Sequence, residues 1–201
     1  MNKIPYFVSI PTIMNNILNI NSRGEFREWL QGNAGSQAEC WVPVKRGRPA
    51  DDNCLYYLDA VEEALCFGWI DSVMKKIDGV TMQRFSPRRK NSPWTELNKE
   101  RCRRLEKLGL MSQAGRDALP EMDIARFEVD PEVVAALKDA GAWTNFTQFP
   151  PLYQRIRAYD VAVSKKRHPE AYEKALARLI EQTRQGKLYG DWNDYGRLLD
   201  Y

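Results

Sequence analysis

The spacing of apolar residues along the chain predicts helices and a strand in its first part. An apolar face at helical spacing follows Ser22, which can open a capping box for a helix over residues 22–31. A short run of β-prone residues at 40–44 predicts a strand. We expect a second helix over residues 59–67, with Asp59 at its amino-terminal cap.

The strongest local signal is a β-hairpin. Residues 70–77 and 80–85 change from helical spacing to an alternation of about two, and Asp78-Gly79 between them is a dipeptide that favours a tight turn. The two runs should therefore pair as antiparallel strands. A turn centred on this dipeptide places Lys75 opposite Met82.

Helical spacing continues through the second half. Ser92-Pro93 is typical of the cap and first residue of a helix, which we expect to run to Leu108. Further helices are predicted over residues 112–119, 131–141, 152–166 and 169–185. We expect no strand after residue 110.

These elements predict an α+β fold, in which a small mixed domain with an antiparallel β-hairpin is followed by an all-helical half. The boundaries that we infer are residues 16–92 for the mixed domain and 93–187 for the helical domain. A tail over residues 188–201 either docks back on the protein or extends from it.

The composition is that of an ordinary globular protein, with 43% hydrophobic and 28% charged residues among 201. The longest apolar run, residues 64–70, is far shorter than the roughly 20 residues that span a bilayer. Prolines interrupt residues 1–20, so we expect no signal-peptide core there. The sequence therefore predicts a cytoplasmic protein without membrane insertion.

Cysteine and histidine usage narrows the chemistry. The four cysteines form no CxxC pair, which favours reduced and mostly buried thiols, although a Cys40–Cys54 disulfide stays open. The single histidine, His168, excludes a histidine-rich metal site, and any serine or cysteine triad would depend on it. We expect no metal, no cofactor and no catalytic residue.

Charge is distributed unevenly, although the net charge is only +3. Residues 75–107 carry 11 basic and 4 acidic groups, a local excess of +7, which we call the basic block. Such a block favours an acidic partner such as phosphate, nucleic acid or an anionic small molecule.

Several ordered motifs carry a family resemblance. They lie at Val61–Ser72, Gln83–Arg89, Ser92–Asn98, Gly109–Gly115 and Ser164–Arg167. Together they resemble the YdeI/OmpD-associated family of bacterial proteins over about residues 20–187. The resemblance implies a link to bacteriocin protection or porins, and to tolerance of envelope-directed toxins or antimicrobial peptides under envelope stress. It implies no particular reaction.

The hairpin should gather several residues into one candidate anion site. Its members are Trp69, Asp71, Lys75, Arg84, Arg88, Arg89 and Trp94. We expect Asp71 and Arg84 to lie diagonally across the two strands, and the arginines at 88 and 89 to lie beside a helix start at Ser92.

Each part of this site also has a purely structural interpretation. Asp71 and Arg84 favour an ordinary ion pair, and the two tryptophans favour the core. The basic loop at 88–90 is equally typical of solvated surface. Glu62 and Glu63 cannot face one substrate together, so we interpret them as a cap and a surface charge.

The sequence thus predicts a binding or interaction protein rather than an enzyme. A first alternative is an enzyme or sensor for a small anionic ligand at the cluster around Trp69, Asp71, Arg84 and Arg88. A second is a weak nucleic-acid binder, which the acidic residues among the cations of helix 93–108 and the lack of a recognised motif disfavour. The expected partner is an anionic small molecule or another protein, and no oligomeric state is indicated.

Overall fold

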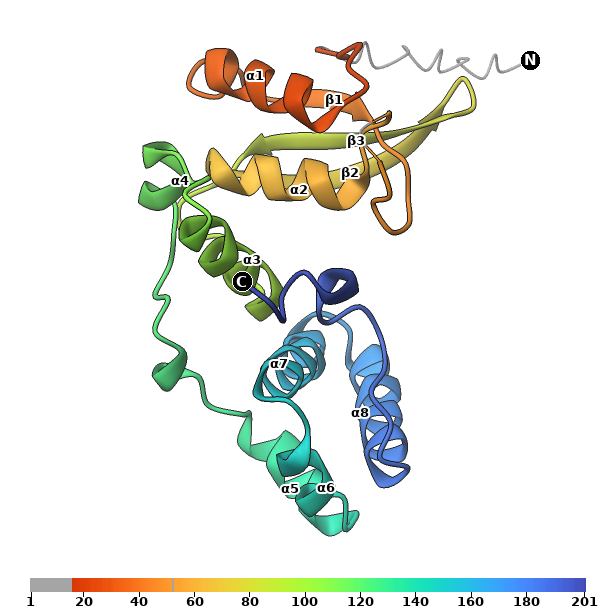
Figure 1. Ribbon diagram of the computed structural model, residues 1–201. Coiled ribbons are helices and arrows are strands. Elements are labelled where there is room, and N and C mark those ends of the chain that lie inside the picture. Colours follow the sequence, from red (N-terminus) through yellow and green to blue (C-terminus); the bar gives the residue numbers. More distant parts are fainter. Residues whose placement is uncertain (1–15, 52) are drawn as a thin grey trace, which may run out of the picture.

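The computed structural model describes residues 16–51 and 53–201 (Figure 1). The first half contains α1 (Arg23–Asn33), β1 (Cys40–Pro43), α2 (Tyr57–Cys66), β2 (Trp69–Ile77), β3 (Val80–Pro87), α3 (Glu96–Lys107) and α4 (Gln113–Asp117). The second half contains η1 (Ile124–Arg126), α5 (Pro131–Asp139), α6 (Trp143–Gln148), α7 (Pro151–Arg167), α8 (Pro169–Arg184) and η2 (Asp194–Gly196). The expectation about a signal-peptide core concerns mainly residues 1–15, which lie outside the described residues.

The strands form one antiparallel sheet in the order β1-β3-β2, and the predicted hairpin is confirmed. Asp78 and Gly79 join β2 to β3 with φ angles of 47° and 83°. Two successive positive φ angles are those of the tight turn whose twist matches a β-hairpin. Lys75 pairs with Met82, as the turn position predicts.

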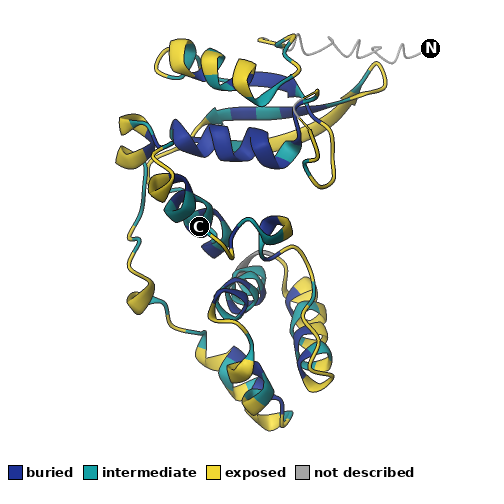
Figure 2. Ribbon diagram, viewed as in Figure 1, coloured by how far each residue is buried: buried dark blue, intermediate teal, exposed yellow. Residues whose placement is uncertain are grey.

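The first core lies between the sheet and the helices of the first half. Helices α1 and α2 contact each other and share this core with the strands, and α3 contributes Cys102 and Leu105. Its other buried members include Phe26, Leu30, Cys40, Val42, Val61, Leu65, Trp69 and Phe85. Figure 2 shows α2 buried along nearly its whole length, which places even its charged residues inside the protein.

The predicted cap of α2 is wrong. The helix begins at Tyr57 after Tyr56, whose side chain makes no capping hydrogen bond. Asp59 instead lies inside the first turn and accepts hydrogen bonds from Arg23 and Arg197. The carboxylate therefore pairs with guanidinium groups from distant segments, which are charged donors, and not with the backbone N–H groups at the start of its own helix.

The predicted start of α3 at Ser92-Pro93 is also wrong. The helix begins at Glu96, and the cap is Thr95, whose side chain accepts from the backbone N–H of Asn98. The Ser92 hydroxyl donates to the carbonyl of Arg89 at 2.8 Å, so it closes the preceding loop instead of capping a helix.

The second half is helical, as the spacing predicts, and within residues 111–201 the structure contains no strand. Its own core includes Val133, Leu137, Phe146, Val161, Tyr172 and Leu179. Together with the sheet of the first half, this confirms the α+β fold class. All four cysteines are free thiols, so the Cys40–Cys54 pair is not bridged.

The tail docks back on the protein. Trp192 and Leu198 are buried against Leu152, Tyr153 and Ile156 of α7. Figure 1 shows the tail returning from the end of α8 toward α3, beside which the carboxyl end of the chain lies.

Candidate functional site

The seven candidate residues separate into several places. Trp69 is a core residue with 1% of its surface exposed. Its indole N–H donates to the carbonyl of Ala34 at 3.1 Å, and its ring meets Trp29 edge-on. A buried tryptophan whose donor is already satisfied offers no face to a ligand, so its structural interpretation holds.

The predicted contact between Asp71 and Arg84 is wrong. A bulge between Asp71 and Met74 shifts the pairing of β2 with β3. Asp71 accepts a hydrogen bond from the Tyr57 hydroxyl at 2.6 Å. Arg84 holds Glu39 through Nε and Nη2, at 2.8 and 2.6 Å. Glu39 precedes β1, which pairs with the other edge of β3, and reasoning from the hairpin alone could not place it there.

Lys75 lies apart from these residues as well. Its ammonium is 5.6 Å from the centre of the Trp41 ring on β1. A cation over an indole face is a favourable contact that needs no ligand. The contact with Trp41 therefore explains the position of the Lys75 side chain without a ligand.

Five of the eleven cations of the basic block are paired with a carboxylate. The pairs are Arg84 with Glu39, Lys99 with Glu96, Arg101 with Asp194, Arg103 with Glu100 and Arg104 with Glu62. Three of these carboxylates come from outside the basic block. A count of the charges within residues 75–107 therefore overstates the positive potential of this block in the folded protein. Among the described residues, Arg88, Arg89 and Lys90 have no carboxylate within ion-pair distance.

Arg88, Arg89 and Trp94 do meet in one pocket. The pocket encloses about 320 Å³ beside the end of β3. One wall is the loop 88–92, and the other is formed by residues 117–120 at the carboxyl end of α4. The only carboxylate in this lining is Asp117, which accepts a hydrogen bond from Gln113. The lining therefore carries three cations against one anion.

Arg88 is held in one orientation in this pocket. Its guanidinium carbon lies 3.7 Å from the centre of the Trp94 ring. Nη1 donates to the Pro93 carbonyl at 3.0 Å and to the Ser92 hydroxyl at 3.3 Å. Trp94 itself is only 9% exposed, so it belongs to the core while one face carries the arginine.

The Nε of Arg88 is buried and has no hydrogen-bond partner among the described residues. Arg84 and Arg101 each use Nε together with Nη2 to hold a carboxylate. Burial without such a partner lowers the pKa of the Arg88 guanidinium from its ordinary value. The Nε and Nη2 edge of a guanidinium thus binds a carboxylate in Arg84 and Arg101. In Arg88 the same edge has no such partner among the described residues.

Glu62 and Glu63 form a buried charge network that the sequence interpretation missed. Their side chains are 0% and 2% exposed, so the assignment to a cap and a surface charge is wrong. Arg23 contacts both, at 2.9 Å from Glu62 and 2.6 Å from Glu63, which shows that adjacent helix residues can share one partner when it is a long arginine. Arg27, Arg104 and Arg197 complete the network. No local sequence pattern predicts this network, because its arginines come from three segments that are distant in the sequence.

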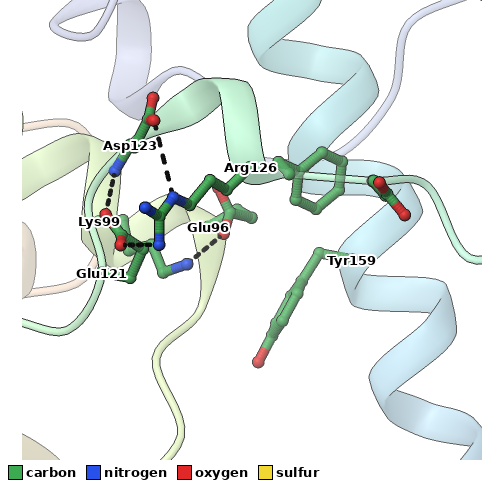
Figure 3. Close-up of a pocket in the computed structure, with 8 residues that line it drawn as sticks. Glu96, Lys99, Glu121, Asp123, Arg126 and Tyr159 are labelled. Atoms are coloured by element: carbon green, nitrogen blue, oxygen red, sulfur yellow. Dashed lines mark hydrogen bonds and ion pairs between the residues drawn. The ribbon is translucent and has the colours of Figure 1, made fainter.

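A second cavity of about 380 Å³ lies between α3, the connection around η1 and α7 (Figure 3). Its charged groups pair with each other: Lys99 lies 2.8 Å from Glu96, and Arg126 lies 2.7 Å from Glu121. In Figure 3, Tyr159 of α7 lies across from these pairs. We call this space the junction cavity. Because both of its cations already have carboxylate partners, it is a weaker anion site than the pocket at Arg88.

Within residues 16–51 and 53–201, no group of three or more histidine, cysteine or acidic residues could hold a metal ion. In the same part of the chain, no helix combines the length and the apolar composition that crossing a bilayer needs.

Fold and site together define an α+β protein with an uncompensated arginine pocket beside a small antiparallel sheet. Residues 18–118, half of the chain, match a family model described as a domain of unknown function (DUF8412). The chain therefore belongs to this family, and over residues 126–186 it carries the domain described as "Bacteriocin-protection, YdeI or OmpD-Associated".

The second match confirms the resemblance to YdeI/OmpD-associated proteins. Several motifs that suggested it, including Val61–Ser72 and Ser92–Asn98, lie in the region that the first model covers. No curated protein and no solved structure matches the chain.

Proposed function

We propose that this protein binds a small anion, a phosphate or a carboxylate, in the pocket beside Arg88. The observation that carries the proposal is the half-buried Arg88 guanidinium, which Trp94 and Pro93 orient and which has no carboxylate partner among the described residues. An unsatisfied buried donor costs about 1–3 kcal/mol, and an anion that accepted from it would recover part of that cost. Arg89 and Lys90 add positive charge at the same pocket.

Binding is a better interpretation than catalysis. General acid or base chemistry needs a group that exchanges protons near neutral pH within reach of the ligand. The described lining of this pocket includes one carboxylate, Asp117, and no histidine or cysteine. We therefore propose a binding or sensing role. Such a role is compatible with bacteriocin protection, which the description of the family model over residues 126–186 mentions. The cytoplasmic location is part of the same proposal.

Nucleic-acid binding is less well supported. Four of the five cations of α3 are paired with carboxylates, which interrupts the continuous basic face that such binding needs.

The test compares two charge-matched double variants. Arg88→Gln with Arg89→Gln removes two cations of the pocket, whereas Lys75→Gln with Lys76→Gln removes two cations of the hairpin. Binding of inorganic phosphate and of acetate is measured by titration calorimetry, together with retention on heparin resin. We expect the first variant to lose at least tenfold in affinity for the anion that binds and the second to change by less than twofold.

A third variant tests the geometry. Arg88→Lys keeps the charge but loses the planar pair of donors, so it should also weaken binding. Equal losses in the two double variants would indicate a general electrostatic effect and refute the pocket. Absence of binding by the unchanged protein to either anion would refute the proposed ligand class.

A further inference from the structure

The tail, residues 188–201, lies beyond both matched regions and yet contacts each of them. It leaves α8 and returns to the boundary between α3 and α7 (Figure 1). Its contacts to the first half are mostly ionic, and its contacts to the second half are mostly apolar.

Asp194 makes the first ionic contact. Its carboxylate accepts from Nε and Nη2 of Arg101 on α3, at 2.7 and 2.8 Å. Both side chains are buried, with 4% of Asp194 and 11% of Arg101 exposed. A bidentate pair in such a site is costly to break, because either partner alone is left buried and charged.

Arg197 makes the second ionic contact. Its Nη1 lies 2.7 Å from Asp59 and 3.1 Å from Glu62, both on α2. The tail thus supplies one arginine of the buried network inside the first half. At the end of the tail, the Tyr201 hydroxyl donates to Glu100 at 2.8 Å.

The apolar contacts face α7. The Trp192 ring meets the Tyr153 ring edge-on with centres 5.5 Å apart. Leu198 is 3% exposed and lies in the same cluster, together with Ile156. One short segment therefore joins α2 and α3 to α7.

The backbone of η2 is strained where these contacts are made. Asp194, Tyr195 and Gly196 have successive φ angles of 49°, 60° and 97°. Residues other than glycine adopt this region at a cost, and such a conformation persists where surrounding contacts hold it. The Arg101–Asp194 pair and the burial of Leu198 on either side of the turn are contacts of this kind.

We propose that residues 188–201 act as a clamp that fixes α3 against α7 and thereby sets the width of the junction cavity. Glu96 and Lys99 of α3 form one wall of that cavity and Tyr159 of α7 forms another (Figure 3). The two helices also touch directly: Arg155 of α7 forms ion pairs with Glu100 at 2.7 Å and with Glu96 at 3.8 Å, and Leu97 of α3 packs against the apolar cluster of α7. The clamp adds ionic and apolar contacts to these, so releasing the tail lets the two helices move apart.

The experiment uses the full-length chain with the tail's charges removed. Asp194→Asn with Arg197→Gln neutralises both ionic contacts, and the control, Lys187→Gln with Asp200→Asn, neutralises one exposed cation and one exposed anion of the same region. Hydrogen exchange is followed at the amides of Gly196 and Leu198, which donate to the Asn193 carbonyl. Small-angle X-ray scattering measures the radius of gyration.

We expect exchange at these amides to become at least tenfold faster in the first variant, with a larger radius of gyration and faster exchange in the facing turns of α3 and α7. The control should match the unchanged protein. Because loss of Asp194 leaves Arg101 buried and unpaired, Trp192→Ala is tested in parallel, since it weakens the clamp only on α7. If the tail is released in either variant while the radius of gyration and the exchange of α3 and α7 stay the same, the clamp is refuted. Unchanged exchange of the tail in both variants refutes it as well.

Discussion

Replacing Glu62 by glutamine tests how much the buried network stabilises the first half. The substitution keeps the shape of the side chain and removes one negative charge. In the structure, Oε1 of Glu62 lies 2.9 Å from Arg104, and Oε2 lies 2.9 Å from Arg23 and 3.1 Å from Arg197. Glu62 is fully buried, so water does not replace these contacts at the carboxylate itself.

The expected magnitude follows from these contacts. Removal of one partner from a buried ion pair costs about 3–5 kcal/mol, because the other charge stays buried without compensation. The three arginines are 17–26% exposed, so water partly solvates them, and Asp59 and Glu63 remain as partners for two of them. We therefore expect the lower end of the range, a loss of about 3 kcal/mol. With a urea dependence of about 2 kcal/mol per molar, the unfolding midpoint should fall by about 1.5 M.

The assay is urea unfolding followed by far-UV circular dichroism. Glu106→Gln is the matched control, because Glu106 forms an ion pair with Arg116 in which the side chains are 47% and 41% exposed. An exposed pair contributes less than about 1 kcal/mol, so the midpoint of this control should move by less than about 0.5 M. If Glu62→Gln moves the midpoint no further than the control does, the network does not stabilise the fold and the reasoning is refuted.

Four further predictions concern packing and buried groups. Trp94→Ala should cost about 3 kcal/mol in urea unfolding, since the side chain is 9% exposed, and a loss below about 1 kcal/mol would contradict its place in the core. Gly115→Ala should destabilise by about 3 kcal/mol or more, because its Cβ would lie 2.2 Å from the Cys66 carbonyl oxygen, whereas Gly24→Ala meets no atom within 4 Å and should be neutral or stabilising. Iodoacetamide should modify Cys54 first in the native protein, because burial raises the pKa of the other three thiols from 9.0 to about 12; mass spectrometry that finds one of those modified first would contradict this. The same raised pKa values mean that the thiols ionise at lower pH in the unfolded chain than in the folded one. The free energy of unfolding should therefore fall as the pH rises from about 9 toward 12. A urea midpoint that stays constant over this pH range would contradict this prediction.

Local signals in the sequence determined the elements. The capping box of Ser22 and Glu25 is formed in full, and the Asp78-Gly79 turn sets the hairpin and the pairing of Lys75 with Met82. Helical spacing after residue 110 was sufficient to predict a helical second half. These features depend on residues within a few positions of each other, so the backbone geometry of one turn or one helix decides them.

The starts of two helices were harder to predict, because contacts outside each helix decided which residue lies at its cap. Both Ser92-Pro93 and Thr95 are typical of a helix start. In the structure the Ser92 hydroxyl donates to the Arg89 carbonyl in the loop, and Thr95 caps the helix. Asp59 suits a cap equally well, but the arginines that it contacts lie 36 residues earlier and 138 residues later in the chain. Only the fold decides which of these bonds is made.

For the candidate site, the sequence by itself determined the residue types, the basic block and the loop that carries Arg88 and Arg89. The tertiary structure decided which of those cations are free to bind. It brought Glu39 to Arg84, Glu62 to Arg104 and Asp194 to Arg101, and it left Arg88 against Trp94 with no carboxylate partner in the part of the chain that the structure describes. The physical reason is that a charge is neutralised by whatever lies within about 4 Å in space, and long-range packing, which no local periodicity encodes, chooses that neighbour.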